Sequence, residues 1–159
     1  MSMNEAQFWR DVVRRQILRY DPTADLTRIE NAVQVGTPDV NGCVRRTDFW
    51  LELKNLERAP KKPTPQNPHC IVKLPRYTQA QRLWHRRRGR AGGRTGVLLR
   101  IVLPVTEYFY FQWPAAVNQL GNVPIEDLRS VATVYAKSTF PVEALVFALM
   151  LPAPKEIEL

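Results

Sequence analysis

Two acidic residues and a lysine within residues 38–54 have the types and the spacing of a hydrolytic metal site. Asp39 lies near the start of this segment, and Glu52 and Lys54 follow near its end, two positions apart. Residues two apart in a strand point to the same face, so Glu52 and Lys54 are expected to be neighbours. Carboxylate oxygens bind hard divalent cations, and an adjacent ammonium group can position water or balance the charge of a phosphate. The segment therefore predicts metal-dependent hydrolysis of a phosphate ester.

This chemistry requires a particular hairpin. For Asp39 and Glu52 to share a metal, they must lie opposite each other on antiparallel strands, so paired residue numbers must sum to about 91. The dipeptide Asn41-Gly42 is a strong two-residue turn signal and favours another register, which would separate the two acids. We give the functional requirement precedence and expect the connection within residues 44–48, with Asn41-Gly42 forming a bulge or irregularity. The two carboxylates are then expected within about 4–6 Å of each other.

The rest of the chain supplies elements that can hold this hairpin. The chain has 159 residues and an apolar content of 45%, which is enough for one domain with its own core. Apolar residues at helical or alternating spacing predict, in order, a helix over 5–20, a strand over 28–35, two strands within 36–54, a helix over 78–89, and strands over 96–102 and 108–113. The expected fold is an α/β domain on a mixed sheet.

Two segments are less regular. Residues 55–77 contain five prolines, which predict an extended loop and exclude a long helix. Residues 114–159 are expected to form short helices packed on the same domain, so that 1–113 is the core and 114–159 is a helical C-terminal extension.

Positive charge is concentrated in the middle of the chain. The net charge is +8, but residues 58–106 contain twelve Lys or Arg and no Asp or Glu. The remainder has more acids than bases. Because such segments release counterions from phosphates on binding, we expect a nucleic-acid partner. The open alternative is a solvated basic face.

The second predicted helix begins at the N-cap Thr78 and is expected to stop at Gly89. We expect Leu83 and Trp84 to belong to the core. The cationic side chains expected to contact phosphates are Arg82, Arg86, Arg87, Arg88, Arg90, Arg94, Lys61 and Lys62.

Three stretches carry a family resemblance: "GTPDV" at 36–40, "FWLELKN" at 49–55 and "TQAQ" at 78–81. They resemble the PD-(D/E)xK nuclease superfamily, and most closely its small virus-type replication-repair nuclease (VRR-NUC) branch, which includes phage proteins similar to Holliday junction resolvases. The resemblance covers about two-thirds of the chain. It implies an αβββαβ restriction-endonuclease-like core and an endonuclease that cleaves DNA with Mg²⁺ or Mn²⁺.

The same resemblance assigns roles to single residues. Asp39 and Glu52 match the metal-binding acids, with the backbone carbonyl of Leu53 as a further ligand, and Lys54 matches the catalytic lysine. Gln81 matches the glutamine that opens the following helix. The family also uses an acid from the first helix, for which we choose Glu5; Glu30 is the alternative.

Other functions and locations were weighed against this one. Two cysteines without a CxxC pair do not indicate a disulfide framework or a zinc site, and no GxxxxGK[ST] loop or GxSxG elbow is present. No membrane span or signal segment is found, so we expect a cytoplasmic protein, in a bacterial host if phage-encoded. DNA, in branched form by preference, is the expected partner, and a homodimer is an open option. The rival function is a non-catalytic nucleic-acid-binding or host-takeover protein on a nuclease scaffold.

Overall fold

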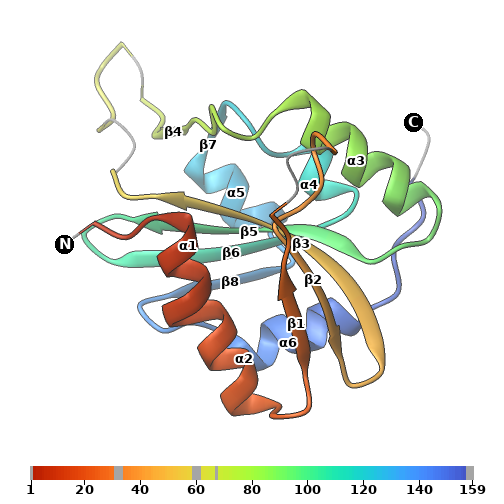
Figure 1. Ribbon diagram of the computed structural model, residues 1–159. Helices are drawn as coiled ribbons and strands as arrows, with labels where there is room; N and C mark the ends of the chain where they lie inside the picture. Colours follow the sequence, from red (N-terminus) through yellow and green to blue (C-terminus); the bar gives the residue numbers. More distant parts are fainter. Residues whose placement is uncertain (1, 31–33, 59–61, 67, 157–159) are drawn as a thin grey trace.

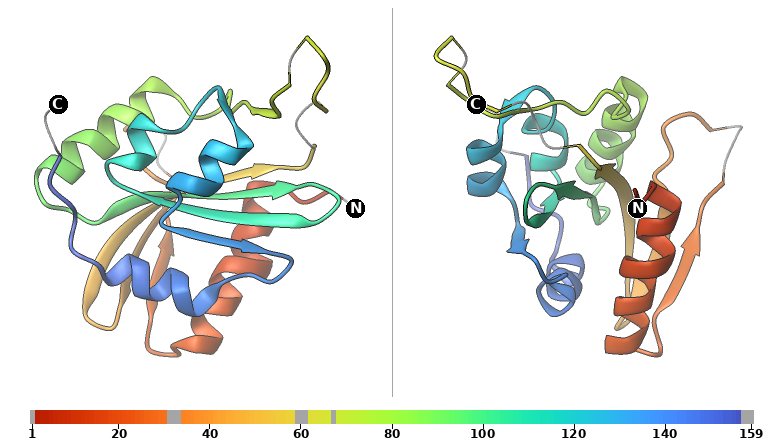
Figure 2. Two further views of the ribbon diagram at one scale, coloured as in Figure 1. Left: turned by 180° about the vertical axis from the view of Figure 1, so that it is seen from behind. Right: turned by 90° about the vertical axis from the view of Figure 1, so that its left-hand side faces the viewer.

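The computed structural model describes residues 2–30, 34–58, 62–66 and 68–156. Its centre is a six-stranded mixed sheet with helices on both faces, as Figures 1 and 2 show. The expected α/β class with a mixed sheet is confirmed. The sheet strands are β1 (Asp25–Arg28), β2 (Val40–Val44), β3 (Thr47–Leu56), β5 (Thr95–Val102), β6 (Thr106–Gln112) and β8 (Val134–Lys137).

The strand order across this sheet is β1-β2-β3-β5-β6-β8. Strands β1, β2 and β3 are antiparallel, β3 and β5 are parallel, and β5, β6 and β8 are again antiparallel. A parallel pair needs a crossover connection, and here it runs from the end of β3 through α3 (Gln79–Arg90). On this connection, β4 (Ile71–Val72) pairs with β7 (Val123–Pro124) in a separate two-stranded sheet.

The N-terminal helix runs from Glu5 to Tyr20, as the apolar spacing predicts. It consists of α1 (Glu5–Gln7), a π-helical stretch η1 (Phe8–Arg14) and α2 (Arg15–Tyr20). Asn4 caps its start through a reciprocal pair of hydrogen bonds with Gln7. This cap fixes the first turn, which carries Glu5.

Each face of the sheet has its own apolar core. On one face, the N-terminal helix and α6 (Val142–Met150) pack over alternate residues of β3, which are Phe49, Leu51 and Leu53. On the other face, α3, α4 (Ala115–Asn118) and α5 (Ile125–Val131) lie over β5 and β6. Glu52 and Lys54, which alternate with the apolar residues of β3, are directed to this second face.

The β2–β3 hairpin has the register that a shared metal requires. Val40 pairs with Leu51 and Val44 with Thr47, so the paired numbers sum to 91. The two turn residues, Arg45 and Arg46, have φ angles of 47° and 67°. Positive φ at both positions is typical of a two-residue hairpin turn. The predicted connection within 44–48 is confirmed.

The irregularity expected at Asn41-Gly42 is wrong. Both residues pair regularly, with Trp50 and Phe49 on one side and with Thr27 and Leu26 on the other. A Cβ atom at Gly42 would lie 2.3 Å from the Phe49 ring, so a side chain here would displace that ring. The glycine makes space in a flat strand, and the turn rule fails because β2 is paired on both edges.

Several other boundaries differ from the expectations. The first strand is 25–28 instead of 28–35, and residues 31–33 lie outside the described part of the chain. Helix α3 continues past Gly89, which packs against the Trp113 ring, and ends at Arg90. Leu83 is 51% exposed and Trp84 is only partly buried outside both apolar cores, so the expectation that they are core residues is wrong. The C-terminal segment contains short helices as expected, but it also supplies the edge strand β8.

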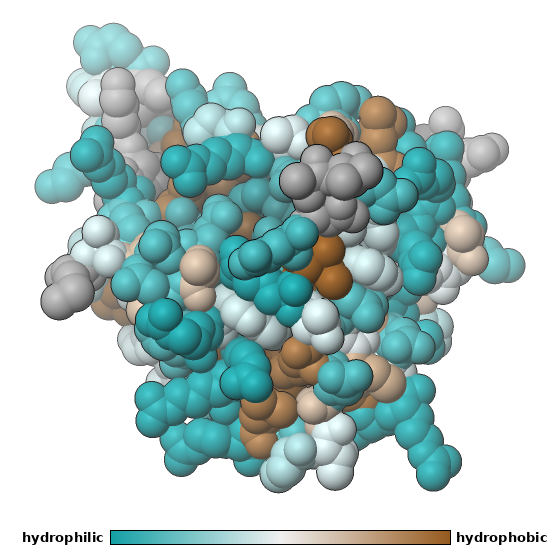
Figure 3. Space-filling view, in the orientation of Figure 1, coloured by the Kyte–Doolittle hydropathy of each residue, from teal (hydrophilic) through white to brown (hydrophobic). Residues whose placement is uncertain are grey.

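The surface is mostly hydrophilic on the side seen in Figure 1, and apolar side chains show there only in small separate areas (Figure 3). Among the described helices, none has the length and apolarity to cross a membrane.

Candidate active site

Strand β3 presents a carboxylate and an ammonium group to the same point below helix α3. Glu52 is 1% exposed and Lys54 is 4% exposed, so both charged groups are almost completely removed from solvent. The Lys54 Nζ atom donates to Glu52 Oε1 at 2.6 Å. The two-residue spacing thus produces the predicted neighbours, but they are buried instead of lying on an open face.

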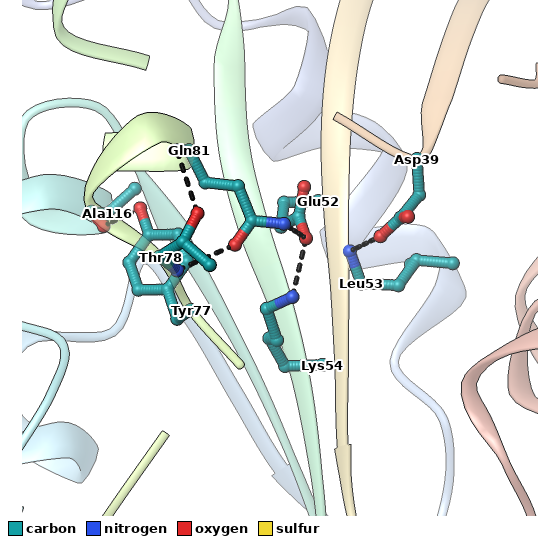
Figure 4. Close-up of polar contacts among 8 residues, drawn as sticks. All are labelled: Asp39, Glu52, Leu53, Lys54, Tyr77, Thr78, Gln81 and Ala116. Carbon is teal, nitrogen blue, oxygen red and sulfur yellow. Dashed lines mark hydrogen bonds and ion pairs between the residues drawn. The ribbon is translucent and has the colours of Figure 1, made fainter. Parts of the chain in front are cut away.

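Gln81 completes this arrangement from the first turn of α3. Its Nε2 atom donates to Glu52 Oε1 at 2.6 Å, and its Oε1 accepts from the backbone N–H of the N-cap residue Thr78 at 2.9 Å (Figure 4). Because the capping box holds the amide, its NH₂ group has a fixed direction. The structure therefore brings Gln81, Glu52 and Lys54 together.

The two oxygens of the Glu52 carboxylate have different surroundings. Both hydrogen bonds go to Oε1, whereas Oε2 is buried and has no hydrogen-bond partner among the described residues. A buried acceptor without a partner costs about 1–3 kcal/mol, so most are satisfied in native proteins. An unsatisfied carboxylate oxygen inside a polar cluster is an available ligand for a cation.

Asp39 lies just before β2, across from Glu52 in the register of the hairpin. Its Oδ2 atom accepts the backbone N–H of Leu53 at 2.8 Å, in the place of a ladder bond beyond the end of β2. The N–H and C=O of one strand residue point toward the same neighbouring strand. The Leu53 carbonyl is therefore directed to the Asp39 side, as its expected role as a ligand requires.

The loop before Asp39 is seated against α3. Gly36 has φ of +89°, and a Cβ there would lie 2.5 Å from the Ala80 carbonyl oxygen. Only glycine combines this close approach with a left-handed conformation. Gly36 thus allows the loop to pack against α3 in the conformation that places Asp39 beside β3.

Glu5 also belongs to this group of carboxylates. Burial raises its pKa, the Lys54 charge lowers it and the Asp39 charge raises it, so Glu5 senses both site residues. Glu5, Lys54 and Arg76 line a cavity of about 520 Å³ beside the end of β3. Glu30 is exposed, and its charge is not among those that shift the pKa of Glu5 or Glu52. The geometry favours Glu5 of the two alternatives.

The electrostatics of the site oppose ionisation of Glu52. Burial, followed by the charge of Asp39, raises the pKa of Glu52 to about 8, although Lys54 lowers it. Glu5 adds a smaller repulsion. The negative charge of Asp39 raises the pKa of both glutamates, so a cation bound among these three carboxylates would compensate the repulsion.

The oxygens present fit a hard divalent cation. Glu52 Oε2, the second oxygen of Asp39 and the Leu53 carbonyl are of the ligand type that Mg²⁺ and Mn²⁺ prefer. Within the described part of the chain, no group of three or more His, Cys, Asp or Glu side chains is arranged to hold a metal. An ion here would therefore depend on the carbonyl, on water and on a substrate phosphate. The expected distance between the two carboxylates stays a prediction.

The predicted cationic residues have different surroundings. Arg82 donates to the Val117 carbonyl and lies over the Tyr77 ring, while Arg94 donates to the Met150 and Leu151 carbonyls. These two arginines tie α3 and the following turn to other elements.

Four further arginines lie on α3. Arg90 pairs with Glu156 at 2.6 Å. Arg86 is partly buried, and its Nε atom lacks a hydrogen-bond partner in the described structure. Arg87 and Arg88 are exposed. Lys62 is also exposed, and Lys61 lies outside the described residues. Contact of these cations with DNA stays a prediction.

Sequence reasoning missed two residues of this region. Arg76 lines the cavity beside Glu5 and Lys54, and its charge lowers the pKa of Glu5. Its place in the acid-free segment, just before the N-cap of α3, was the available signal. Trp50 lies on the same face of β3 as Glu52, as the alternation along the strand indicated. Its contact with Trp84 could not be read from that alternation.

A scan against models of protein families and a search of curated proteins each find no match for this chain.

Proposed function

We propose that the protein is a divalent-metal-dependent endonuclease that hydrolyses DNA phosphodiester bonds and prefers branched DNA. The observation that carries the proposal is the Glu52 carboxylate: it is buried, oriented by Lys54 and Gln81 through one oxygen, and unsatisfied at the other.

The fold supports the same proposal. A helix, three antiparallel strands, a crossover helix and a strand parallel to the third follow in the order expected for a PD-(D/E)xK core. The proposed ligands lie on β3 and at the start of β2, and Gln81 opens the crossover helix. The restriction-endonuclease-like topology is part of the proposal.

The chain's own residues then have distinct tasks. Asp39 and Glu52 would supply oxygens to Mg²⁺ or Mn²⁺, and Gln81 fixes the direction of the Glu52 carboxylate. A bound ion would lower the pKa of a water molecule and reduce the negative charge of the phosphate. Lys54, whose ammonium lies at the same carboxylate, holds the attacking water or the non-bridging phosphate oxygen. Glu5 contributes negative charge at the opening of the cavity.

The direct test is incubation of the protein with branched, linear duplex and single-stranded DNA in Mg²⁺, Mn²⁺ or EDTA. We expect cleavage with either metal, none in EDTA, and the fastest cleavage on branched DNA. Asp39→Asn and Lys54→Met should stop cleavage and leave binding largely intact, because binding depends on the arginines. Glu30→Gln is the matched control, since Glu30 is an exposed acid outside the site.

The rival function, a non-catalytic nucleic-acid-binding protein, predicts a different result. If the protein only binds, DNA should be bound but not cleaved in either Mg²⁺ or Mn²⁺. Asp39→Asn should then tighten DNA binding, because it removes a carboxylate that repels phosphate. The unsatisfied Glu52 oxygen favours the catalytic function, because a protein that only binds phosphates gains nothing from it.

The binding surface is tested separately. Arg87→Gln and Arg88→Gln should each weaken binding to all sequences and reduce the salt slope by about one. Arg19→Gln, an exposed arginine on α2 at the opposite face, changes the net charge equally and should leave the slope unchanged. An unchanged slope in all three variants would assign the arginines of α3 to a solvated face.

A further inference from the structure

An aromatic pocket lies next to the proposed active site. The rings of Trp50 and Trp84 are partly buried, with centroids 5.1 Å apart and planes inclined by 56°. The Arg88 guanidinium lies 5.8 Å from one ring centroid and 5.9 Å from the other. The cavity that these residues line, with Thr37 and Arg87 at its edge, has a volume of about 340 Å³. This is near the lower limit for small-ligand pockets and suits one planar group.

Three segments supply both the pocket and the proposed active site: Thr37 and Asp39 from the loop before β2, Trp50 and Glu52 from β3, and Trp84 and Gln81 from α3. Two residues of a strand span about 6.6 Å, and three residues of a helix rise about 4.5 Å. These lengths are comparable to one nucleotide of an extended strand. A phosphate at Glu52 would therefore place an adjoining base at the pocket.

The chemistry of the pocket fits a nucleobase. Aromatic rings that keep part of a face accessible stack on bases of any sequence, and an adjacent arginine adds a cation–π contribution and attracts the backbone. Trp84 lies on α3, which carries no acidic residue, since residues 58–106 contain no Asp or Glu. The faces of a paired base are covered by the bases above and below it, so only an unpaired or extruded base can stack here.

We propose that the Trp50–Trp84 pocket binds an unpaired base next to the scissile phosphate, and that this contact selects DNA with single-stranded character. The proposal rests on the proposed nuclease function for its place in a reaction. The binding step itself needs no metal and no cleavage.

The test measures binding in EDTA, where cleavage is absent. A single-stranded DNA of about 12 nucleotides covers a typical site of this kind. Trp84→Ala should weaken its binding about 5- to 150-fold, the effect of losing one stacked base. Binding to a blunt duplex of the same length and the salt slope should not change. Leu83→Ala is the matched control, because Leu83 is the preceding residue of α3 and is 51% exposed.

Two further measurements distinguish loss of stacking from misfolding of the Trp84→Ala variant. Trp84→Phe keeps an aromatic face and should restore most of the single-strand binding. With the wild-type protein, single strands in which one base after another is replaced by an abasic site should show one position with a loss similar to that of Trp84→Ala. The same sequence as RNA should bind less tightly.

Equal losses on single-stranded and duplex DNA in Trp84→Ala, or no position-dependent loss with abasic strands, would overturn the proposal. RNA bound more tightly than DNA, with the same dependence on Trp84, would overturn it for DNA. Failure of the nuclease function would appear elsewhere, as absent cleavage of every substrate by the wild-type protein in Mg²⁺ and Mn²⁺.

Discussion

Two buried glutamates on the central sheet have nearly equal exposure but opposite surroundings. Glu52 is 1% exposed on β3, and Glu107 is 2% exposed on β6. Glu107 accepts from Arg129 with both oxygens and from the Tyr135 hydroxyl, and Lys137 lies 3.8 Å away. Glu52 accepts with one oxygen only.

This difference separates a structural carboxylate, Glu107, from Glu52, for which we propose a function. At Glu107, donors fill both oxygens, and the ion pairs tie β6, α5 and β8 together. At Glu52, repulsion from Asp39 accompanies the attraction of Lys54, and no donor from the described residues binds Oε2. A folding requirement alone would favour the first arrangement, because a partly satisfied buried network is less stable than a fully satisfied one. The stability lost at Glu52 is consistent with selection for a ligand.

The largest expected effect is on cleavage. Glu52→Gln removes the free carboxylate oxygen and should lower the rate of DNA cleavage at least about 100-fold. Glu107→Gln, the matched change at an equally buried position, should alter the rate less than about threefold. Steady-state cleavage of one branched substrate, with circular dichroism of both variants, provides the comparison. Equal losses in the two variants would remove the functional distinction between the two glutamates.

The second effect is a pH dependence of the metal-free protein. The pKa of Glu52 is about 8 in the fold, above its ordinary value of 4.5. Between these values the folded state holds a proton that the unfolded state has lost, so this group's contribution to stability falls as the pH rises. Urea unfolding from pH 5 to pH 8 should show a decline that Glu52→Gln reduces. Mn²⁺ should counteract the decline, since it binds the ionised form. A decline of the same size in Glu52→Gln would assign it to other groups.

The third effect concerns the structural glutamate. Glu107→Gln leaves the partly buried Arg129 without its carboxylate and should lower the free energy of unfolding by about 1.5–3 kcal/mol at pH 7. Chemical denaturation measures the loss, and Glu143→Gln on α6 is a control at an exposed acid. A loss below about 0.5 kcal/mol would show that the network is weaker than its geometry indicates.

The smallest effect separates capping from positioning. Gln81→Ala removes both the capping box and the hydrogen bond to Glu52, and it should lower the cleavage rate about tenfold and the stability by about 1 kcal/mol. Thr78→Ala removes the cap but keeps the Glu52 contact, so it should lower stability similarly with little loss of rate. Equal rates in the two variants would mean that Gln81 acts on the helix alone.

The alternation of β3 was sufficient to predict the strand and its faces, and the requirement that Asp39 and Glu52 share a metal predicted the hairpin register. The same patterns could not predict that Glu52 and Lys54 would be buried, because their cover comes from α3, about thirty residues away in the chain. Local rules also misplaced the first strand and the end of α3. Gly89 is a helix interior residue because Trp113 needs the space, and that contact is invisible to helix-end statistics.

The candidate site also contains residues that the sequence indicated and others that only the fold could identify. Residue types indicated Asp39, Glu52, Lys54 and Gln81, but only the fold could favour Glu5 over Glu30, since this choice depends on how the N-terminal helix meets the end of β3. The engagement of Arg82 and Arg94 by backbone carbonyls was likewise beyond sequence reasoning. Charge density alone does not distinguish a cation that binds DNA from one that binds its own chain.

The hydrogen bond between Gln81 and Glu52 closes a chain loop across 29 positions, and residues 62–66 within that loop are exposed. Loop-closure entropy grows only logarithmically, and doubling the length of such a loop adds about 0.6 kcal/mol. The proline-rich connection is therefore a place where an additional segment can be inserted at small thermodynamic cost. An inserted reporter domain at 63–65 would leave the ends of β3 and α3 in register, and a related protein could acquire an additional domain here without rebuilding the proposed active site.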